Sequence, residues 1–245
     1  MNVRLSRADL SALPERLSPA EAAELFRRLR EKMGIPKPEL HAPNPFCFLV
    51  SVVLSAQATD KSVNLATAPL YEQISTPERM LELGEEGLIP YIRSIGLYNA
   101  KARHIMELSR QLIENFGGEV PSTREELMTL SGVGRKTANV VLNVIFHEPT
   151  MPVDTHVFRV CNRTGLAPGK DVREVEDGLE RMVPAEYALH AHHWLLLHGR
   201  YVCTARKPHC SECVLTGLCR WVSVESSAGA ADGQDGENLS VKERL

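Results

Sequence analysis

The chain has little aromatic content and no long apolar run. Aromatic residues make up 5% of the 245 residues, and no stretch approaches the roughly 20 consecutive apolar residues that a membrane-spanning helix needs. The first 17 residues contain no apolar segment of the kind found in secretory signal peptides, and Asp9 and Glu15 are untypical of an organelle transit peptide. We therefore expect no membrane partner and a cytoplasmic location, on the nucleoid if the organism is a bacterium.

The chain also lacks an excess of positive charge. Its formal net charge is −3, which is unusual for a DNA-binding protein. Residues 225–245 contain five acidic and two basic residues, so the rest of the chain is neutral. Any nucleic-acid surface on this chain must therefore be a local patch. Composition predicts a disordered acidic tail over residues 222–245, and residues 1–17 form a weakly patterned N-terminal extension.

Convincing strand alternation is absent, and helix signals take its place. Ser18 and Pro19, followed by Glu21, form a helix start of the capping-box type. From Phe46 the sequence FCFLVSVVL is apolar throughout, which indicates a buried helix, although its β-branched residues keep a strand open as an alternative. With 43% hydrophobic and 24% charged residues, the composition is that of a globular protein. The pattern predicts an all-α fold.

Residues 122–146 predict two helices joined by a hairpin. Ser122 would cap the first helix, and the second would begin at Arg135. Between them, Gly132 and Gly134 are free to adopt positive φ and to present bare backbone N–H groups. A helix N-terminus with free donors binds anions, and the anion that suits this hairpin is a nucleic-acid phosphate.

We accordingly expect four consecutive hairpin residues to bind DNA. They are Gly132, Val133, Gly134 and Arg135. Lys136 follows in the first turn of an otherwise apolar helix, where an ordinary surface lysine is the plain interpretation. However, the positive end of the helix dipole disfavours a second positive charge and so favours the neutral amine. Because a neutral lysine amine is a nucleophile, Lys136 is a candidate catalytic residue.

Three further residues have ordinary interpretations when they are taken alone. Asp154 stands where a helix N-cap is expected. Gln57 ends the apolar run as a polar residue that a surface position would also explain. Leu97 lies in a loop, and loop apolar residues are usually tucked under a helix.

Four of the six cysteines cluster within 17 residues. They are Cys203, Cys210, Cys213 and Cys219, spaced C-x6-C-x2-C-x5-C. Since the chain shows no secretion signal, close thiols indicate a metal site rather than disulfides. Zinc and an iron–sulfur centre both remain open at this point. Cys47 and Cys161 lie alone in apolar segments and are expected to be buried.

Basic residues lie on the segment between Cys203 and Cys210 and just before it. Arg206 and Lys207 lie on the loop between two of the cysteines, and Arg200 comes just before it. We expect them to form the local positive patch that the charge count requires, although a merely solvated loop is the plain alternative.

Several segments together resemble the bacterial endonuclease III family of the helix-hairpin-helix DNA glycosylase superfamily. The matching motifs are LSAQATD at 54–60, IGLYNAKA at 95–102, GEVP at 118–121, LSGVGRKTANVVLN at 130–143, VDTHVFRVCNRTG at 153–165 and HHWLLLHGRYVC at 192–203. The resemblance covers roughly residues 20–221. The hairpin alone would be weak evidence, whereas these motifs are specific as a set.

The resemblance implies two helical domains with the active cleft between them. Residues 38–148 would form a helical barrel that carries the hairpin at 130–136. Residues 18–37 and 149–221 would form the second domain. The four clustered cysteines would hold a [4Fe-4S] cluster. Lys136 and Asp154 would then lie on opposite walls of the cleft.

The resemblance also implies an activity, a bifunctional DNA glycosylase and abasic-site lyase that excises oxidised pyrimidines in base excision repair. The partner would be duplex DNA with damaged bases or abasic sites, bound by a monomer. Lys136 would attack the sugar and form a Schiff base, and Asp154 would assist. Gln57 would fill the gap left by the flipped base, and Leu97 would wedge the opposite strand.

Two other classes are compatible with parts of the pattern. An adenine-mismatch glycosylase of the same superfamily would share the hairpin but lack the catalytic lysine, so Lys136 argues against it. A non-catalytic iron–sulfur DNA-binding protein would not need the pair of Lys136 and Asp154. The chain departs from the family at Met128, where members can carry an acidic residue before the hairpin.

Overall fold

The computed structural model describes residues 14–221 and is helical throughout that part. Residues 1–13 and 222–245 lie outside it, so most of the predicted N-terminal extension and the predicted acidic tail stay untested. Within the described residues there is no strand, as the all-α prediction required. The helices are α1 (Pro19–Met33), α2 (Pro45–Leu54), α3 (Asp60–Tyr71), α4 (Pro77–Ile92), α5 (Tyr98–Phe116), α6 (Arg124–Leu127), α7 (Arg135–Ile145), α8 (Thr155–Thr164), α9 (Val172–Met182) and α10 (Ala188–Tyr201).

Short polar side chains set most of the helix starts. Ser18 and Glu21 form the predicted capping box at the start of α1. At α6 the prediction is wrong by one residue, because the cap is Thr123 and not Ser122. The Thr123 hydroxyl accepts a hydrogen bond from the Glu126 backbone N–H at 3.3 Å and donates one to the Glu126 carboxylate at 2.7 Å.

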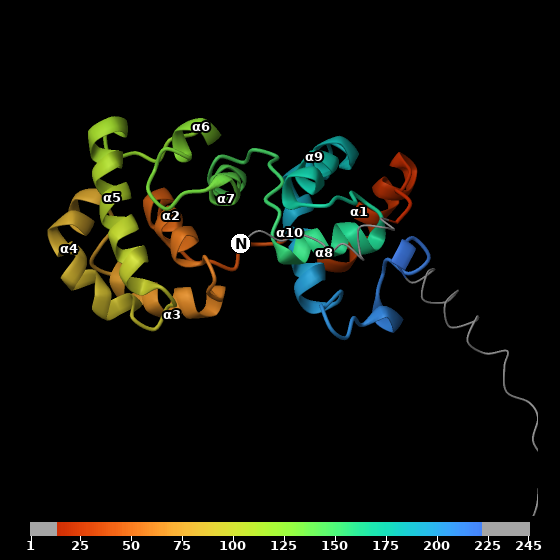
Figure 1. Ribbon diagram of the computed structural model, residues 1–245, viewed down its shortest axis with the longest axis horizontal. Coiled ribbons are helices and arrows are strands. Elements are labelled where there is room, and N and C mark those ends of the chain that lie inside the picture. Colours follow the sequence, from red (N-terminus) through yellow and green to blue (C-terminus); the bar gives the residue numbers. More distant parts are fainter. Residues whose placement is uncertain (1–13, 222–245) are drawn as a thin grey trace, which may run out of the picture.

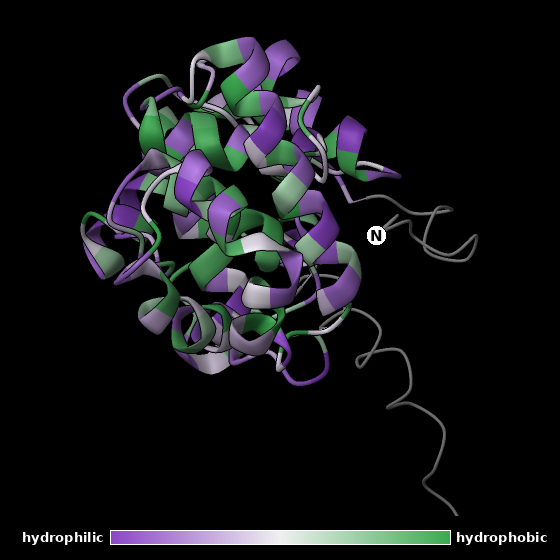
Figure 2. Ribbon diagram, turned by 90° about the vertical axis from the view of Figure 1, so that its left-hand side faces the viewer, coloured by the Kyte–Doolittle hydropathy of each residue, from purple (hydrophilic) through white to green (hydrophobic). Residues whose placement is uncertain are grey.

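Helices α2 to α7 enclose a first hydrophobic core. Its centre is α2, in which every residue from Phe46 to Leu54 is buried, so the prediction of a buried helix in this apolar run is confirmed. The surrounding helices are amphipathic and turn one apolar face toward α2. In Figure 2 these outer helices carry both purple and green residues around their circumference. Among the described residues, no helix is long and apolar enough to cross a membrane.

Helices α1, α8, α9 and α10 enclose a second core, built from the two ends of the described chain. Trp194 lies at its centre with 1% of its surface exposed, and its indole N–H donates to the Gly34 carbonyl at 2.8 Å. Gly199 allows α10 to approach α8, since a Cβ at that position would lie 2.9 Å from the Cβ of His156. Figure 1 shows this group on the right and helices α2 to α6 on the left.

Helix α7 lies between the two groups and is fastened to the second one. On one side, Glu176 of α9 is buried and pairs with Arg135 at 2.9 Å, and the Asn139 amide donates to the same carboxylate at 2.9 Å. On another side, the Asn143 amide donates to the carbonyl of Leu189 in the first turn of α10 at 3.1 Å. These contacts fix the position of α7 relative to the second core. The domain boundaries at 37/38 and 148/149 stay predictions.

Candidate active site

A pocket of about 80 Å³ opens between the two cores, and both groups of helices line it. Lys136 comes from the first turn of α7, and Asp154 comes from the start of α8. Glu39 and its neighbours on the linker after α1 line another part of the wall, and His192 of α10 a further part. The fold thus brings together the two residues predicted to be catalytic, although 17 residues separate them in the chain.

The hairpin before Lys136 is held by α5. The His104 ring nitrogen Nδ1 lies 2.9 Å from the Ser131 hydroxyl, and the Ser131 backbone N–H donates to the Gln111 side chain at 2.7 Å. Gly132 has a φ of +78°, as predicted, and a Cβ there would lie 3.0 Å from the Cβ of His104. Gly134 differs from the prediction: its φ is −93°, because it is the extended N-cap of α7.

Two residues of the predicted DNA-binding hairpin have structural roles that the sequence did not reveal. Val133 is 6% exposed and belongs to the first core. The Arg135 guanidinium donates from Nε to both Glu176 carboxylate oxygens at 3.0 Å. Because its side chain is engaged in this way, a DNA contact at Arg135 would come from the backbone N–H.

Asp154 caps α8 and lines the pocket at the same time. Its Oδ1 accepts hydrogen bonds from the backbone N–H groups of His156 and Val157, both at 2.8 Å. Both capping bonds use Oδ1, so the cap does not require Oδ2. The capping and pocket roles, which were alternatives in the sequence, are therefore compatible in the structure.

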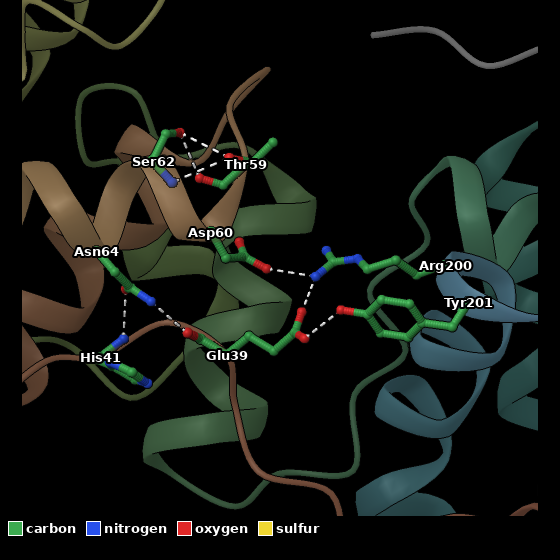
Figure 3. Close-up of polar contacts among 8 residues, drawn as sticks. All are labelled: Glu39, His41, Thr59, Asp60, Ser62, Asn64, Arg200 and Tyr201. Atoms are coloured by element: carbon green, nitrogen blue, oxygen red, sulfur yellow. Dashed lines mark hydrogen bonds and ion pairs between the residues drawn. The ribbon is translucent and has the colours of Figure 1, made fainter.

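An ionic network that the sequence did not predict lies beside this pair. Arg200 of α10 forms ion pairs with Glu39 on the linker and with Asp60 at the start of α3, the latter at 2.9 Å. The Tyr201 hydroxyl donates to the Glu39 carboxylate at 2.8 Å. Figure 3 shows these side chains meeting between the two groups of helices. Arg200 therefore neutralises acidic groups here and is not part of the basic loop after Cys203, contrary to the prediction.

Burial shapes the electrostatics of the pocket. It raises the pKa of Asp60, an effect that Lys136 opposes and Asp154 reinforces, so the three charges act on one another. Burial also holds the pKa of His192 well below its usual value, and the neighbouring His193 and Lys136 add to this effect. At neutral pH the His192 wall of the pocket is therefore uncharged.

Gln57 and Leu97 share an unusual backbone conformation. Gln57 follows the end of α2 with a φ of +59°, and Leu97 precedes α5 with a φ of +61°. Apart from glycine, only these two residues and His147 have positive φ among residues 14–221. Leu97 is 63% exposed, so the ordinary interpretation, in which it is tucked under a helix, is wrong. Such strain is typical of functional positions.

The four clustered cysteines line a single pocket at the end of α10. The Arg163 guanidinium donates to the Cys203 sulfur at 3.5 Å and to the carbonyls of Thr204 and Ala205. Four thiols that converge on a largely apolar pocket suit an iron–sulfur cluster. Cys47 and Cys161 are buried elsewhere, as predicted, and burial raises the pKa of Cys47 to about 11.

The basic loop that follows Cys203 exposes Arg206 and Lys207, and its shape is held by a hydrogen bond from the Thr204 hydroxyl to the Lys207 carbonyl at 2.6 Å.

The hairpin, the cleft and the cysteine pocket define a helical DNA-repair protein with an iron–sulfur centre, and comparisons with known proteins agree. Residues 50–185 match the family of HhH-GPD superfamily base excision DNA repair proteins. Residues 203–219 match the iron-sulfur binding domain of endonuclease III. The [4Fe-4S] cluster predicted from the resemblance is supported by this match and by the relatives described next.

Curated relatives and solved structures place the chain within that superfamily. It is 55% identical over 205 residues to endonuclease III of Escherichia coli K12, covering 84% of this chain and 97% of the relative. Endonuclease III of Haemophilus influenzae is 54% identical over 198 residues, covering 81% and 94%. The structure of a trapped endonuclease III–DNA covalent intermediate matches with a TM-score of 0.81 at 43% identity, covering 86% of this chain and 99% of that one.

The chain therefore belongs to the endonuclease III family. At the level of the family, the function predicted from the sequence is confirmed, a base excision repair DNA glycosylase and abasic-site lyase for oxidised pyrimidines. A thermostable thymine-DNA glycosylase shares the fold at a TM-score of 0.75 and 23% identity. Family membership argues against both alternatives, the adenine-mismatch glycosylase and the non-catalytic DNA-binding protein.

Proposed function

We propose that Lys136 is the nucleophile of this glycosylase and lyase. Its amine would attack C1′ of the damaged nucleotide, and the bond between C1′ and the base would break with departure of the base. Opening of the sugar ring then gives a Schiff base between Lys136 and C1′. This linkage acidifies the C2′ proton, and its removal expels the 3′ phosphate and cuts the strand. The observation that carries the proposal is that Lys136 and Asp154 line one pocket.

Asp154 would act as the carboxylate partner of the lysine. A carboxylate next to the amine can accept the proton that the attacking nitrogen loses, and it stabilises positive charge that develops on the sugar. The α8 cap holds Oδ1 through two backbone N–H groups. The cap thus orients the carboxylate before the substrate arrives.

The hairpin and two exposed side chains would prepare the DNA. The Gly132 and Gly134 backbone faces solvent before the N-terminus of α7, a geometry that binds phosphate. Once the damaged nucleotide leaves the stack, Gln57 would occupy the gap and Leu97 would enter the opposite strand. Both side chains are exposed, and an apolar wedge such as Leu97 holds DNA kinked.

The four cysteines would bind the cluster as thiolates and take no part in the chemistry. When it is bound, the cluster supplies a crosslink that holds the loop between Cys203 and Cys210 against DNA. Arg206 and Lys207 on that loop are exposed, which suits contacts to phosphates. We also propose that the protein acts as a cytoplasmic monomer on nucleoid DNA, because duplex DNA is its proposed substrate and this chain supplies both Lys136 and Asp154 to the pocket.

Borohydride trapping on a duplex with one thymine glycol tests the assignment. The native protein should give a covalent protein–DNA adduct, and Lys136→Gln should give none while it still binds the duplex. Asp154→Asn should retain some adduct at a rate lower by about a hundredfold or more, in line with the usual contribution of a positioned acid or base. Arg79→Gln, on the distant helix α4, is the control for non-specific effects.

Two results would overturn the assignment. Base release without an adduct from the native protein would identify a monofunctional glycosylase that uses water. An adduct that persists in Lys136→Gln would place the Schiff base on another amine, which peptide mapping of the trapped complex would then locate.

A further inference from the structure

A buried lysine outside the catalytic pair links the two residues proposed to enter DNA. Lys101 lies in the first turn of α5 and is 5% exposed. A buried ammonium group is costly unless strong acceptors surround it. Its Nζ donates to the Leu54 carbonyl at 2.8 Å and to the Ala56 carbonyl at 2.7 Å. Both acceptors belong to the end of α2 and the turn that follows it.

These carbonyls are natural partners for a cation. The Leu54 carbonyl is among the last of α2, which have no backbone N–H partner within the helix and form the negative end of its dipole. The Ala56 carbonyl lies in the turn just beyond that end. By contrast, the start of α5 disfavours a positive charge. The position of Lys101 is therefore explained by what its ammonium group binds at the end of α2, and not by the helix to which it belongs.

The contacts of Lys101 reach the peptide groups next to both proposed wedge residues. The Ala56 carbonyl belongs to the peptide group that precedes Gln57. On the other side, the Lys101 backbone N–H donates to the Leu97 carbonyl at 3.0 Å, which belongs to the peptide group that follows Leu97. One residue thus holds the backbone beside Gln57 through its side chain and the backbone beside Leu97 through its main chain.

Both peptide groups adjoin strained residues. The φ of Gln57 is +59° and that of Leu97 is +61°, and such values for side chains of this size require the surrounding structure to enforce them. At Gln57 the turn is otherwise exposed: Ala56 and Gln57 both face solvent. The two hydrogen bonds from the buried Lys101 ammonium group tie this exposed turn to the first turn of α5.

We propose that Lys101 is a positioning residue that fixes the distance between Gln57 and Leu97 and so sets the two-sided wedge for duplex DNA. The inference rests on the proposed roles of those two residues. It predicts that Lys101 matters where bases must be unstacked and not where the sugar is already accessible, because Lys101 does not line the catalytic pocket.

Lys101→Met tests this, since methionine keeps an unbranched apolar stem but donates no hydrogen bond. The single-turnover rate of thymine glycol release from duplex DNA should fall by about tenfold to a hundredfold, the range expected when reacting groups are misplaced. Borohydride trapping on an abasic site in single-stranded DNA should stay within about twofold of the native rate. Fluorescence of 2-aminopurine opposite the lesion should rise less on binding than it does with the native protein.

Tyr71→Phe is a matched control. The Tyr71 hydroxyl of α3 is partly buried and donates to the Cys47 carbonyl in the first turn of α2 at 2.7 Å. The variant therefore loses a hydrogen bond to the same helix, far from the end that Lys101 contacts. It should leave the ratio of duplex release to single-strand trapping unchanged. Lys101→Arg should restore part of that ratio, because it returns donors to the same site.

The outcomes separate this inference from the proposed function. An equal loss of duplex release and single-strand trapping in Lys101→Met would make Lys101 a residue of general stability and overturn the inference. Native rates of both reactions in Lys101→Met would overturn it as well. Failure of the native protein to form any adduct would instead refute the role of Lys136, and the 2-aminopurine signal would then still test Lys101.

Discussion

Two elements are proposed to contact DNA phosphates, the hairpin at residues 130–136 and the cysteine loop at residues 203–219. They are fixed in different ways. The hairpin is held by the polypeptide itself, through hydrogen bonds from Ser131 to α5 and through the conformation of Gly132. The cysteine loop is short of regular structure, with one 3₁₀ turn at Cys210–Glu212, and its thiols converge on a cluster site. One element folds with its core, whereas the other depends on a cofactor.

Loss of one cluster ligand should have the largest effect, and the effect should be confined to the cysteine loop. In Cys213→Ala we expect the visible absorbance and the bound iron to be lost, because three thiolates no longer complete the ligand set. Amides in residues 203–219 should then lose protection from hydrogen exchange, since metal binding and local folding are coupled. Amides of the hairpin should keep theirs.

The control is Cys47→Ala, which removes a buried thiol from the first core and should retain the iron. If the hairpin amides in Cys213→Ala exchanged as fast as those of the loop, the two elements would form one cooperative unit and the contrast would fail.

A change at Gly132 should have an intermediate effect, now on the hairpin. Gly132→Ala places a Cβ 3.0 Å from His104 at a φ of +78°. We expect it to reduce the free energy of unfolding by about 1–2 kcal/mol from the left-handed backbone alone, and to weaken DNA binding. Urea unfolding and fluorescence anisotropy on an abasic-site duplex measure the two effects.

Gly117→Ala separates the effect of the left-handed backbone from that of the steric contact with His104. Gly117 has a φ of +61°, ends α5 and has open space around it. It should lose similar stability with unchanged DNA affinity. Equal losses of affinity in the two variants would show that global stability, and not hairpin geometry, limits binding.

Single charges on the cysteine loop should have the smallest effect. Arg206→Ser and Lys207→Ser should each weaken binding to all duplexes alike and reduce the slope of log affinity against log salt by about 1. Anisotropy titrations over a range of salt concentrations measure that slope. Arg79→Ser on α4, at the far left of Figure 1, should leave it unchanged, and a slope unchanged in the loop variants would remove the loop from the DNA interface.

Local chemistry made much of the fold predictable. The capping box at Ser18, the apolar α2, the hairpin and the cap at Asp154 all depend on neighbours within a few residues. Gly134 was misjudged because an N-cap is extended, and a glycine in a hairpin does not reveal which conformation it takes. The meeting of Lys136 with Asp154 came from the family resemblance alone, since no periodicity encodes contact between helices.

The sequence could not predict ion pairs between residues that are distant in the chain. Asp60 begins α3, and nothing local links it to Arg200, which is 140 residues away. Arg200 in turn was assigned to the basic loop because it is near the loop in the chain. The identity of an ion-pair partner depends on the packing of whole helices, and that information is spread over both cores.

The buried carboxylate of Glu176 bears on how natural variants of this protein should be judged. Helix α9 contains four acidic residues. Judged from its charge alone, each would be expected to lie on the surface and to tolerate substitution. Three of them are exposed or half-buried, but Glu176 is 5% exposed and receives donors from Arg135 and Asn139 of the helix that carries Lys136. A Glu176→Lys allele would therefore be expected to raise the rate of mutation in its host, although the residue touches neither substrate nor metal.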